Sequence, residues 1–221
     1  MTYATQVRAN LPRPLSRLFA CLKTPSKVQD YLDALPVNFE LSGESNFSPI
    51  TVLEKNTAHC FEGAVFAAAA LAFHGHRPIL LDFATAYDDE DHTVALFKRG
   101  KYWGAISKTN HAVLKYRDPI YASVRELAMS YAHEYYLYDG RKSLRAYSKP
   151  FDLSKYDPKK WITSGESLDW LMKEVSHSRY FPVVPKNYER FLRRASKVEL
   201  KALKIIDFPD PRKKKTGCNQ R

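Results

Sequence analysis

One cysteine stands where a thiol could act as a nucleophile. Cys60 follows a polar stretch, residues 38–57, and opens the apolar segment Cys60–His74, which Gly75 follows. Apolar residues on nearly every side predict a buried helix. The free N–H groups of its first turn and the helix dipole favour the reactive thiolate, and could also hold the oxyanion formed when a carbonyl is attacked. The position predicts acyl chemistry; the alternative is a small buried apolar residue.

A histidine is predicted to lie near this cysteine. Residues 92–98 and 102–107 alternate in polarity as strands do, and the pair Arg99-Gly100 predicts a tight hairpin turn between them. With that pair at the centre of the turn, His92 lies opposite Ser107. His92 also follows an acidic turn, residues 88–91, at the edge of the sheet, where an imidazole could meet Cys60. A Cys–His pair whose imidazole is oriented by a third side chain is the general arrangement for thiol acyl transfer; the alternative is that His92 only begins a strand.

The remaining patterns supply the elements that must position these residues. We expect a third strand at 79–84 and an α+β fold, in which the buried Cys-bearing helix packs on an antiparallel sheet and further helices follow toward the C-terminus. The four alanines at 67–70 would let a neighbouring element approach the helix closely. Helices are predicted at 15–22, 25–35, 121–138, 168–175 and 188–206, and loops at 38–57 and 148–165.

Together these segments resemble the transglutaminase-like superfamily, a branch of the papain-like cysteine fold. The resemblance covers residues 26–120 and depends on the order and spacing of Ala58-His59-Cys60-Phe61-Glu62-Gly63-Ala64, His92-Thr93-Val94-Ala95-Leu96 and Tyr102-Trp103-Gly104-Ala105-Ile106. It implies that Cys60 is the nucleophile and His92 the general base of an enzyme that attacks an amide. Such an enzyme would be a peptidase, an amidase or a transglutaminase, and its substrate a protein, a peptide or a small amide.

The third catalytic position departs from the family pattern. The family commonly places Asp four residues after a Trp in the last of these strands, and Ser107 stands there. A serine hydroxyl can accept a hydrogen bond from an imidazole but cannot stabilise imidazolium by charge. Asn110 could instead orient the ring through its amide, and the sequence leaves both residues open. Because of Ser107, the alternative function is a catalytically inactive relative that acts as a binding or scaffold protein.

Other side chains near Cys60 could support the reaction. The second donor of an oxyanion hole could be Gln29, Asn38 or Asn46, and the sequence does not choose among them. His59 adjoins Cys60 and is expected to point elsewhere, as a supporting or loop residue. Glu62 could simply favour the helix N-terminus.

Neither a metal nor a cofactor is expected. His74 and His76 straddle the end of the buried helix, and no acid or cysteine stands nearby at ligand spacing. The chain also has no phosphate-binding loop and no glycine-rich dinucleotide motif.

The positive charge lies mainly at one end of the chain. The 221 residues include 35 Lys and Arg against 24 Asp and Glu, and residues 186–221 hold twelve of these bases against four acids. A hydrophobic content of 44% is typical of a globular protein, and no apolar run approaches the ~20 residues of a membrane span. The basic end could contact an acidic partner. Nucleic acid lacks support because residues 192–207 contain no aromatic side chain for base stacking, and a solvated helix face is the alternative.

These patterns divide the chain into an N-terminal segment (1–24), a transglutaminase-like domain (25–185), a basic C-terminal helix (186–207) and a basic flexible tail (208–221). The three cysteines, Cys21, Cys60 and Cys218, are too few and too scattered for a disulfide framework, which favours a cytoplasmic location. The alternative is an organellar transit peptide, because the first acid is Asp30. Prolines at 12, 14 and 25 would interrupt its amphipathic helix.

Overall fold

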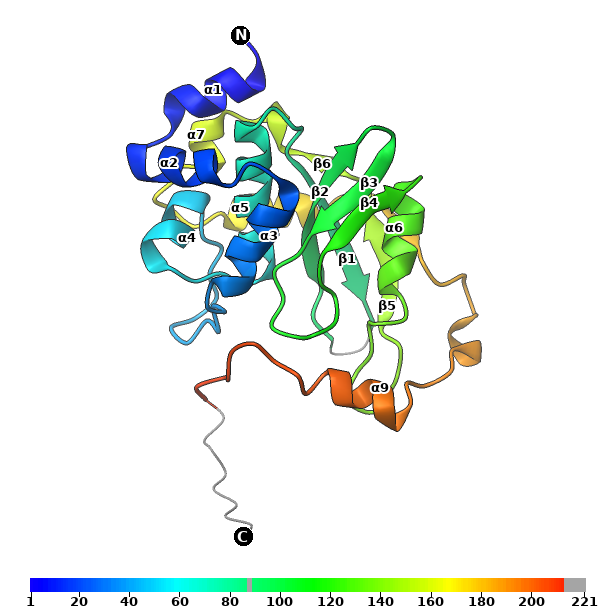
Figure 1. Cartoon of the computed structure of the whole chain (residues 1–221). Helices are drawn as coiled ribbons and strands as arrows, with labels where there is room; N and C mark the ends of the chain where they lie inside the picture. Colours follow the sequence, from blue (N-terminus) through cyan, green and yellow to red (C-terminus); the bar gives the residue numbers. More distant parts are fainter. Residues whose placement is uncertain (87–88, 213–221) are drawn as a thin grey trace.

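A computed structural model describes residues 1–86 and 89–212 and shows an α+β fold (Figure 1). The helices are α1 (Tyr3–Asn10), α2 (Arg13–Cys21), α3 (Pro25–Ala34), α4 (Pro49–Lys55), α5 (Cys60–Phe73), α6 (Val124–Tyr131), α7 (Pro158–Trp161), α8 (Asp169–Ser176) and α9 (Lys197–Ala202), with 3₁₀ turns η1 (Leu153–Lys155) and η2 (Glu189–Phe191). The strands are β1 (Ile79–Thr85), β2 (His92–Arg99), β3 (Tyr102–Ile106), β4 (Arg117–Tyr121), β5 (Leu144–Ser148), β6 (Phe151–Asp152) and β7 (Tyr180–Pro182).

Within the described residues the strands form one antiparallel sheet. Its order is β4-β3-β2-β1-β5-β7, and β6 pairs with β1 beside β5. The chain therefore enters at the centre of the sheet, runs outward through β2, β3 and β4, and then crosses back to the other edge. The end of β1, the start of β2 and the end of β3 lie at the same end of the sheet (Figure 1).

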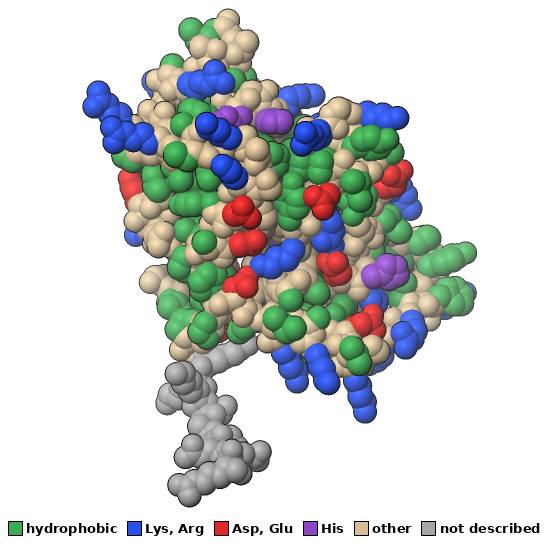
Figure 2. Space-filling model, viewed as in Figure 1, with side chains coloured by type: hydrophobic (Ala, Val, Ile, Leu, Met, Phe, Trp, Pro, Cys, Tyr) green, Lys and Arg blue, Asp and Glu red, His purple; other side chains and the backbone are tan. Residues whose placement is uncertain are grey.

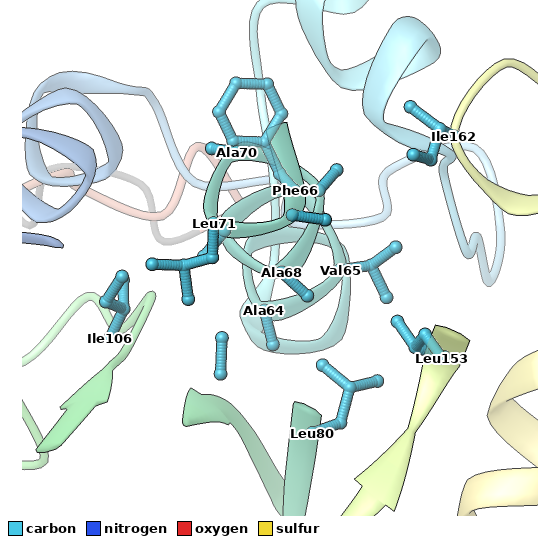
Figure 3. Close-up of a cluster of buried hydrophobic side chains, with 14 of the residues drawn as sticks. Ala64, Val65, Phe66, Ala68, Ala70, Leu71, Leu80, Ile106, Leu153 and Ile162 are labelled. Atoms are coloured by element: carbon cyan, nitrogen blue, oxygen red, sulfur yellow. The ribbon is translucent and has the colours of Figure 1, made fainter. Parts of the chain in front are cut away.

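Helix α5 is buried, as its composition predicts. Residues 64–70 have no exposed surface, and the helix packs on β1 and β2. Figure 3 shows Ala64 and Ala68 facing Leu80 of the sheet, while Leu71 points toward Ile106. The alanines let the helix axis approach the strands closely, and Gly75, with φ at +92°, ends the helix. The predicted Cys-bearing helix on an antiparallel sheet is confirmed.

The N-terminal helices surround α5, while α6 covers the opposite face of the sheet (Figure 1). Val7, Leu15 and Phe19 are fully buried in the core that contains α5. Helix α3 begins as predicted, because the Thr24 hydroxyl accepts a hydrogen bond from the amide of Lys27 at the first turn. Residues 1–24 thus contribute side chains to the same core as the helix that carries Cys60.

The predicted register of the hairpin is wrong by two residues. Lys98 pairs with Trp103 instead of Lys101, because Gly100 and Lys101 occupy the centre of the turn. Gly100 has φ at +62°, the positive value that the first central residue of a type II′ turn requires. The last backbone pair between β2 and β3 is therefore Ala95 with Ile106, and His92 and Ser107 lie beyond the paired region.

Two predicted helices are shorter than expected. Ser123 caps α6 by accepting a hydrogen bond from the amide of Glu126, and the residues before it form strand β4 instead of helix. Ser196 caps α9 with Glu199 as its reciprocal partner, so the predicted helix 188–206 is interrupted. Val198 of α9 is consequently exposed, at 75%, whereas Leu203 just after the helix is buried.

Some elements were not predicted at all. Helix α4 lies in the expected loop 38–57, and α1, β4, β5, β6, β7 and α7 were also missed.

Of the acidic turn, Asp88 lies outside the described residues, as do residues 213–221 of the tail and most of its basic cluster. Figure 2 shows Lys and Arg side chains gathered along the rim of the molecule that α9 forms. Contact of this end with an acidic partner stays a prediction.

In the part of the chain that the structure describes, none of the helices has the length and apolar character needed to cross a bilayer.

Candidate active site

Cys60 lies at the end of the sheet where the central strand β2 begins. It is the first residue of α5 and is half-buried, and its Sγ atom is 4.0 Å from the carbonyl oxygen of Asp91. The side chains of His59 and His92 both lie close enough to the Cys60 thiol to lower its pKa. The structure therefore brings the predicted Cys60 and His92 together, and adds a second imidazole that the sequence did not assign to the site.

The surroundings of Cys60 favour its thiolate. Burial raises the pKa of the thiol, but hydrogen bonds from His59 and His92, together with their positive charge, outweigh burial. The net pKa of Cys60 lies well below its usual range. A lowered thiol pKa is what a nucleophilic cysteine requires near neutral pH.

The Ser107 hydroxyl fixes the tautomer of His92. It lies 2.8 Å from Nε2 of His92 and donates its single proton to the carbonyl oxygen of Leu114, at 2.6 Å. Because a carbonyl can only accept, the hydroxyl must accept from His92, and Nε2 must carry a proton. In the neutral imidazole, Nδ1 is then the unprotonated nitrogen that remains for Cys60. The predicted contact between His92 and Ser107 is present although the ladder pairs with a different register.

Ser107 is itself held firmly in place. The side-chain amide of Gln29 accepts from the backbone N–H of Ser107 at 2.9 Å and donates to its carbonyl oxygen at 2.7 Å. The next residue, Lys108, is buried and donates to carbonyl oxygens at the end of α3. Gly63 makes room for this segment against α5, because a Cβ atom there would lie 2.4 Å from Cβ of Lys108. The residue that orients His92 is thus fixed from two helices.

Asn110 is not brought to His92. Its side-chain Nδ2 donates to the carbonyl oxygen of Phe208, and its Oδ1 accepts from the backbone N–H of the same residue, both at 2.8 Å. The amide therefore anchors the beginning of the C-terminal tail. Of the two residues that the sequence left open for the third position, Ser107 hydrogen-bonds to His92, whereas the amide of Asn110 bonds to Phe208.

The buried carboxylate of Glu62 organises the other side of Cys60. Glu62 has no exposed surface and accepts hydrogen bonds from the side chains of Asn38 and Ser45 and from the backbone N–H groups of Phe47 and His59. It thereby ties the loop before α4 to the first turn of α5. Its position three residues after His59 matches a capping box, which is the signal that could have revealed this role.

His59 is oriented by this carboxylate and by the loop. Its Nε2 atom is 2.7 Å from the carbonyl oxygen of Ser45 and 3.4 Å from Oε1 of Glu62. Burial lowers the pKa of His59, but the hydrogen bond to Cys60, the negative charges of Cys60 and Glu62 and the Ser45 carbonyl together raise it from 6.5 to about 9. The imidazole that was expected to point elsewhere therefore lies against the thiol.

The three side-chain amides predicted as oxyanion donors are engaged elsewhere. Gln29 donates to Ser107 and Asp33, Asn38 donates to Ser45 and Glu62, and Asn46 donates to Asp169. The first-turn N–H groups of α5 remain the donors closest in sequence to Cys60.

A second buried carboxyl group lies close enough to feel the charge of Cys60. Asp82 accepts hydrogen bonds from the hydroxyls of Thr93 at 2.7 Å and Tyr180 at 2.6 Å. Burial raises its pKa from 3.8 to about 6, with the negative charges of Asp91 and Cys60 acting in the same direction. No local pattern predicts this group, because its two hydroxyl partners come from β2 and β7, which are remote in sequence.

Among residues 1–86 and 89–212, no group of three or more His, Cys, Asp or Glu side chains is placed to hold a metal ion. No protein-family model matches the chain, and no curated protein has a matching sequence. The function is therefore inferred from the geometry around Cys60.

Proposed function

We propose that the protein is a cysteine-dependent acyl-transfer enzyme of the transglutaminase-like type, which attacks an amide through Cys60 and His92. The observation that carries the proposal is the hydrogen bond between His92 and Ser107. It leaves Nδ1 of His92 free to act as a base toward the thiol. The buried Cys-bearing helix on an antiparallel sheet supports the same family, because it is the core that the resemblance implies.

The reaction would proceed through a thioester. His92 takes the thiol proton, and the sulfur of Cys60 forms a bond to the carbonyl carbon while the carbonyl oxygen becomes an oxyanion. The carbon–nitrogen bond then breaks as His92 returns the proton to the leaving amine. Water or a second amine, deprotonated by His92, next attacks the thioester and releases the thiol. Water as acceptor makes the enzyme a peptidase or amidase, and an amine acceptor makes it a transglutaminase.

The second candidate function is a non-catalytic relative that binds a partner. It is favoured by Ser107, which orients His92 but supplies no negative charge to stabilise its imidazolium form. An inactive relative needs neither a reactive thiol nor a thioester, so both properties distinguish the two functions.

The proposal is tested by trapping the thioester. We would treat the protein with p-nitrophenyl acetate and locate the acetyl group by mass spectrometry, with Cys60→Ser as control. The proposal predicts acetylation of Cys60, turnover that methylamine accelerates if amines are acceptors, and alkylation by iodoacetamide at pH 6 that is faster at Cys60 than at the exposed Cys21. No thioester, with Cys60 alkylated no faster than Cys21, would favour the non-catalytic function.

A further inference from the structure

We propose that His59 is a second catalytic histidine: a fixed cation, backed by the buried carboxylate of Glu62, that holds the Cys60 thiolate while His92 carries the moving proton. The inference rests on the proposed function, because it assigns the charge that Ser107 cannot supply to the opposite side of the sulfur. Glu62 would replace, through His59, the acid that is missing at position 107.

The hydrogen bonds of the two imidazoles fix the positions of the protons around the sulfur. Nε2 of His59 faces the carbonyl oxygen of Ser45, which can only accept, so this nitrogen carries a proton. The same holds for Nε2 of His92, which donates to Ser107. Both imidazoles therefore have only Nδ1 left for the thiol with which they interact. A thiol has one proton and can satisfy one such nitrogen, whereas a thiolate accepts hydrogen bonds from two protonated nitrogens.

The two imidazoles differ in the charges that lie near Nε2. Carboxylate oxygens approach Nε2 of His59 from two residues, Glu62 at 3.4 Å and Glu40 at 3.9 Å. The corresponding nitrogen of His92 faces the neutral hydroxyl of Ser107. An adjacent negative charge stabilises the imidazolium form, so the permanent positive charge belongs on His59.

The carboxyl group of Glu62 is surrounded by hydrogen-bond donors. Its oxygens accept from four groups, the side chains of Asn38 and Ser45 and the backbone N–H groups of Phe47 and His59. All four interactions use a donor proton of the partner, which suits an ionised carboxylate. A buried carboxylate requires a nearby cation, and His59 supplies it.

The arrangement divides the work between two histidines. His59 takes its proton from solvent and keeps it throughout the cycle, balanced by Glu62. The thiol proton moves to His92, and from there to the leaving amine, as in the proposed reaction. The charged groups that face the sulfur and its partners include His59, His92, Glu62 and Glu40, and both Asp82 and Tyr135 also feel the charge of Cys60.

The test is the pH profile of Cys60 alkylation in His59→Gln. We would measure the rate with iodoacetamide from pH 4 to 9, and use His74→Gln as the matched control. His74 lies at the other end of α5, and its Nε2 atom also contacts a carbonyl oxygen, that of Phe19 at 2.7 Å. We expect His59→Gln to shift the profile upward in pH and to slow alkylation at pH 6 at least ~10-fold, which corresponds to one pKa unit or more. The control should keep the wild-type profile.

The outcomes separate this inference from the proposed function. If wild-type Cys60 reacts rapidly at pH 6 and His59→Gln leaves its profile unchanged, the role of His59 is overturned and the Cys60–His92 pair survives. If wild-type Cys60 reacts no faster than Cys21, the proposed function fails. Should the variant not fold, nitrogen-15 NMR of wild-type protein decides at pH 7.5: two protonated ring nitrogens on His59 support the inference, and one overturns it.

Discussion

The two sides of Cys60 hold their imidazoles in similar ways but in different electrostatic surroundings. Nε2 of His59 and Nε2 of His92 each donate to an oxygen atom at 2.7–2.8 Å, which leaves Nδ1 for the sulfur. Behind His59 lies the buried carboxylate of Glu62, while behind His92 lies only the hydroxyl of Ser107. A single acid commonly both orients the imidazole and supplies negative charge. Here Ser107 orients one imidazole, and Glu62 supplies the charge on the opposite side of the sulfur.

Replacing His92 is expected to cause the largest loss of turnover. His92→Gln removes the base that activates the attacking water, so turnover of p-nitrophenyl acetate should fall about 10³-fold, within the range for loss of general base catalysis. Steady-state kinetics checks this, with His111→Gln as control because its imidazole bonds to the carbonyl oxygen of Leu203. Equal losses in both variants would contradict a specific role for His92.

A smaller loss of turnover is expected when Ser107, which supports His92, is displaced and the imidazole itself is kept. In Gly63→Ala the new methyl group would lie 2.4 Å from Cβ of Lys108, so the segment that carries Ser107 must shift. A displacement of this kind can reduce turnover about 10²-fold and destabilise the fold by about 1–3 kcal/mol. Turnover and urea unfolding measure the two effects. Gly165→Ala is the matched control, because no atom lies within 4 Å of its new Cβ, and it should change neither quantity.

A smaller effect compares the two residues proposed for the third position. Ser107→Ala removes an uncharged hydrogen bond to His92, so we expect about a five-fold loss of turnover, consistent with the ~1 kcal/mol of such a bond. Asn110→Ala should change turnover less than about two-fold, because its amide bonds to Phe208. The interpretation of Ser107 would be wrong if Asn110→Ala had the greater effect on turnover.

Replacing Asp82 is expected to have the smallest effect on activity. It should instead change how the free energy of unfolding depends on pH. Its pKa is raised from 3.8 to about 6, so the folded state favours the protonated carboxyl, and this contribution to stability is lost as the pH rises through about 6. Asp82→Asn removes the ionisation. Relative to wild type, the free energy of unfolding of the variant should therefore increase between pH 4 and 7, by up to about 3 kcal/mol. Urea unfolding at the two pH values checks this, and a constant difference would contradict the assignment.

The sequence revealed the parts of the site that depend on local pattern. Cys60 and its helix were predictable because a long apolar run that ends at a glycine is typical of a buried helix. The contact between His92 and Ser107 was predicted even though the register was wrong. The error arose because Gly100 takes the first central position of the turn, a choice that the residue type alone does not determine.

The remaining parts depend on contacts that are remote in sequence. Asn110 was a reasonable candidate until Phe208, 98 residues later, was seen to occupy its amide. The role of His59 depends on the path of the loop that brings Ser45 to its ring, and no local pattern sets that path. Strand β7 and the buried Asp82 escaped prediction for the same reason, because Tyr180 joins them only in the folded sheet.

The most direct test of the account is the ionisation of Cys60 itself. The thiolate absorbs at 240 nm, so the difference between wild type and Cys60→Ser, followed across pH, reports the fraction ionised. With two imidazoles beside the sulfur, we expect a midpoint well below that of an unperturbed thiol, which is about 8.5. A midpoint at or above that value would show that the two imidazoles do not activate Cys60, and would contradict the account.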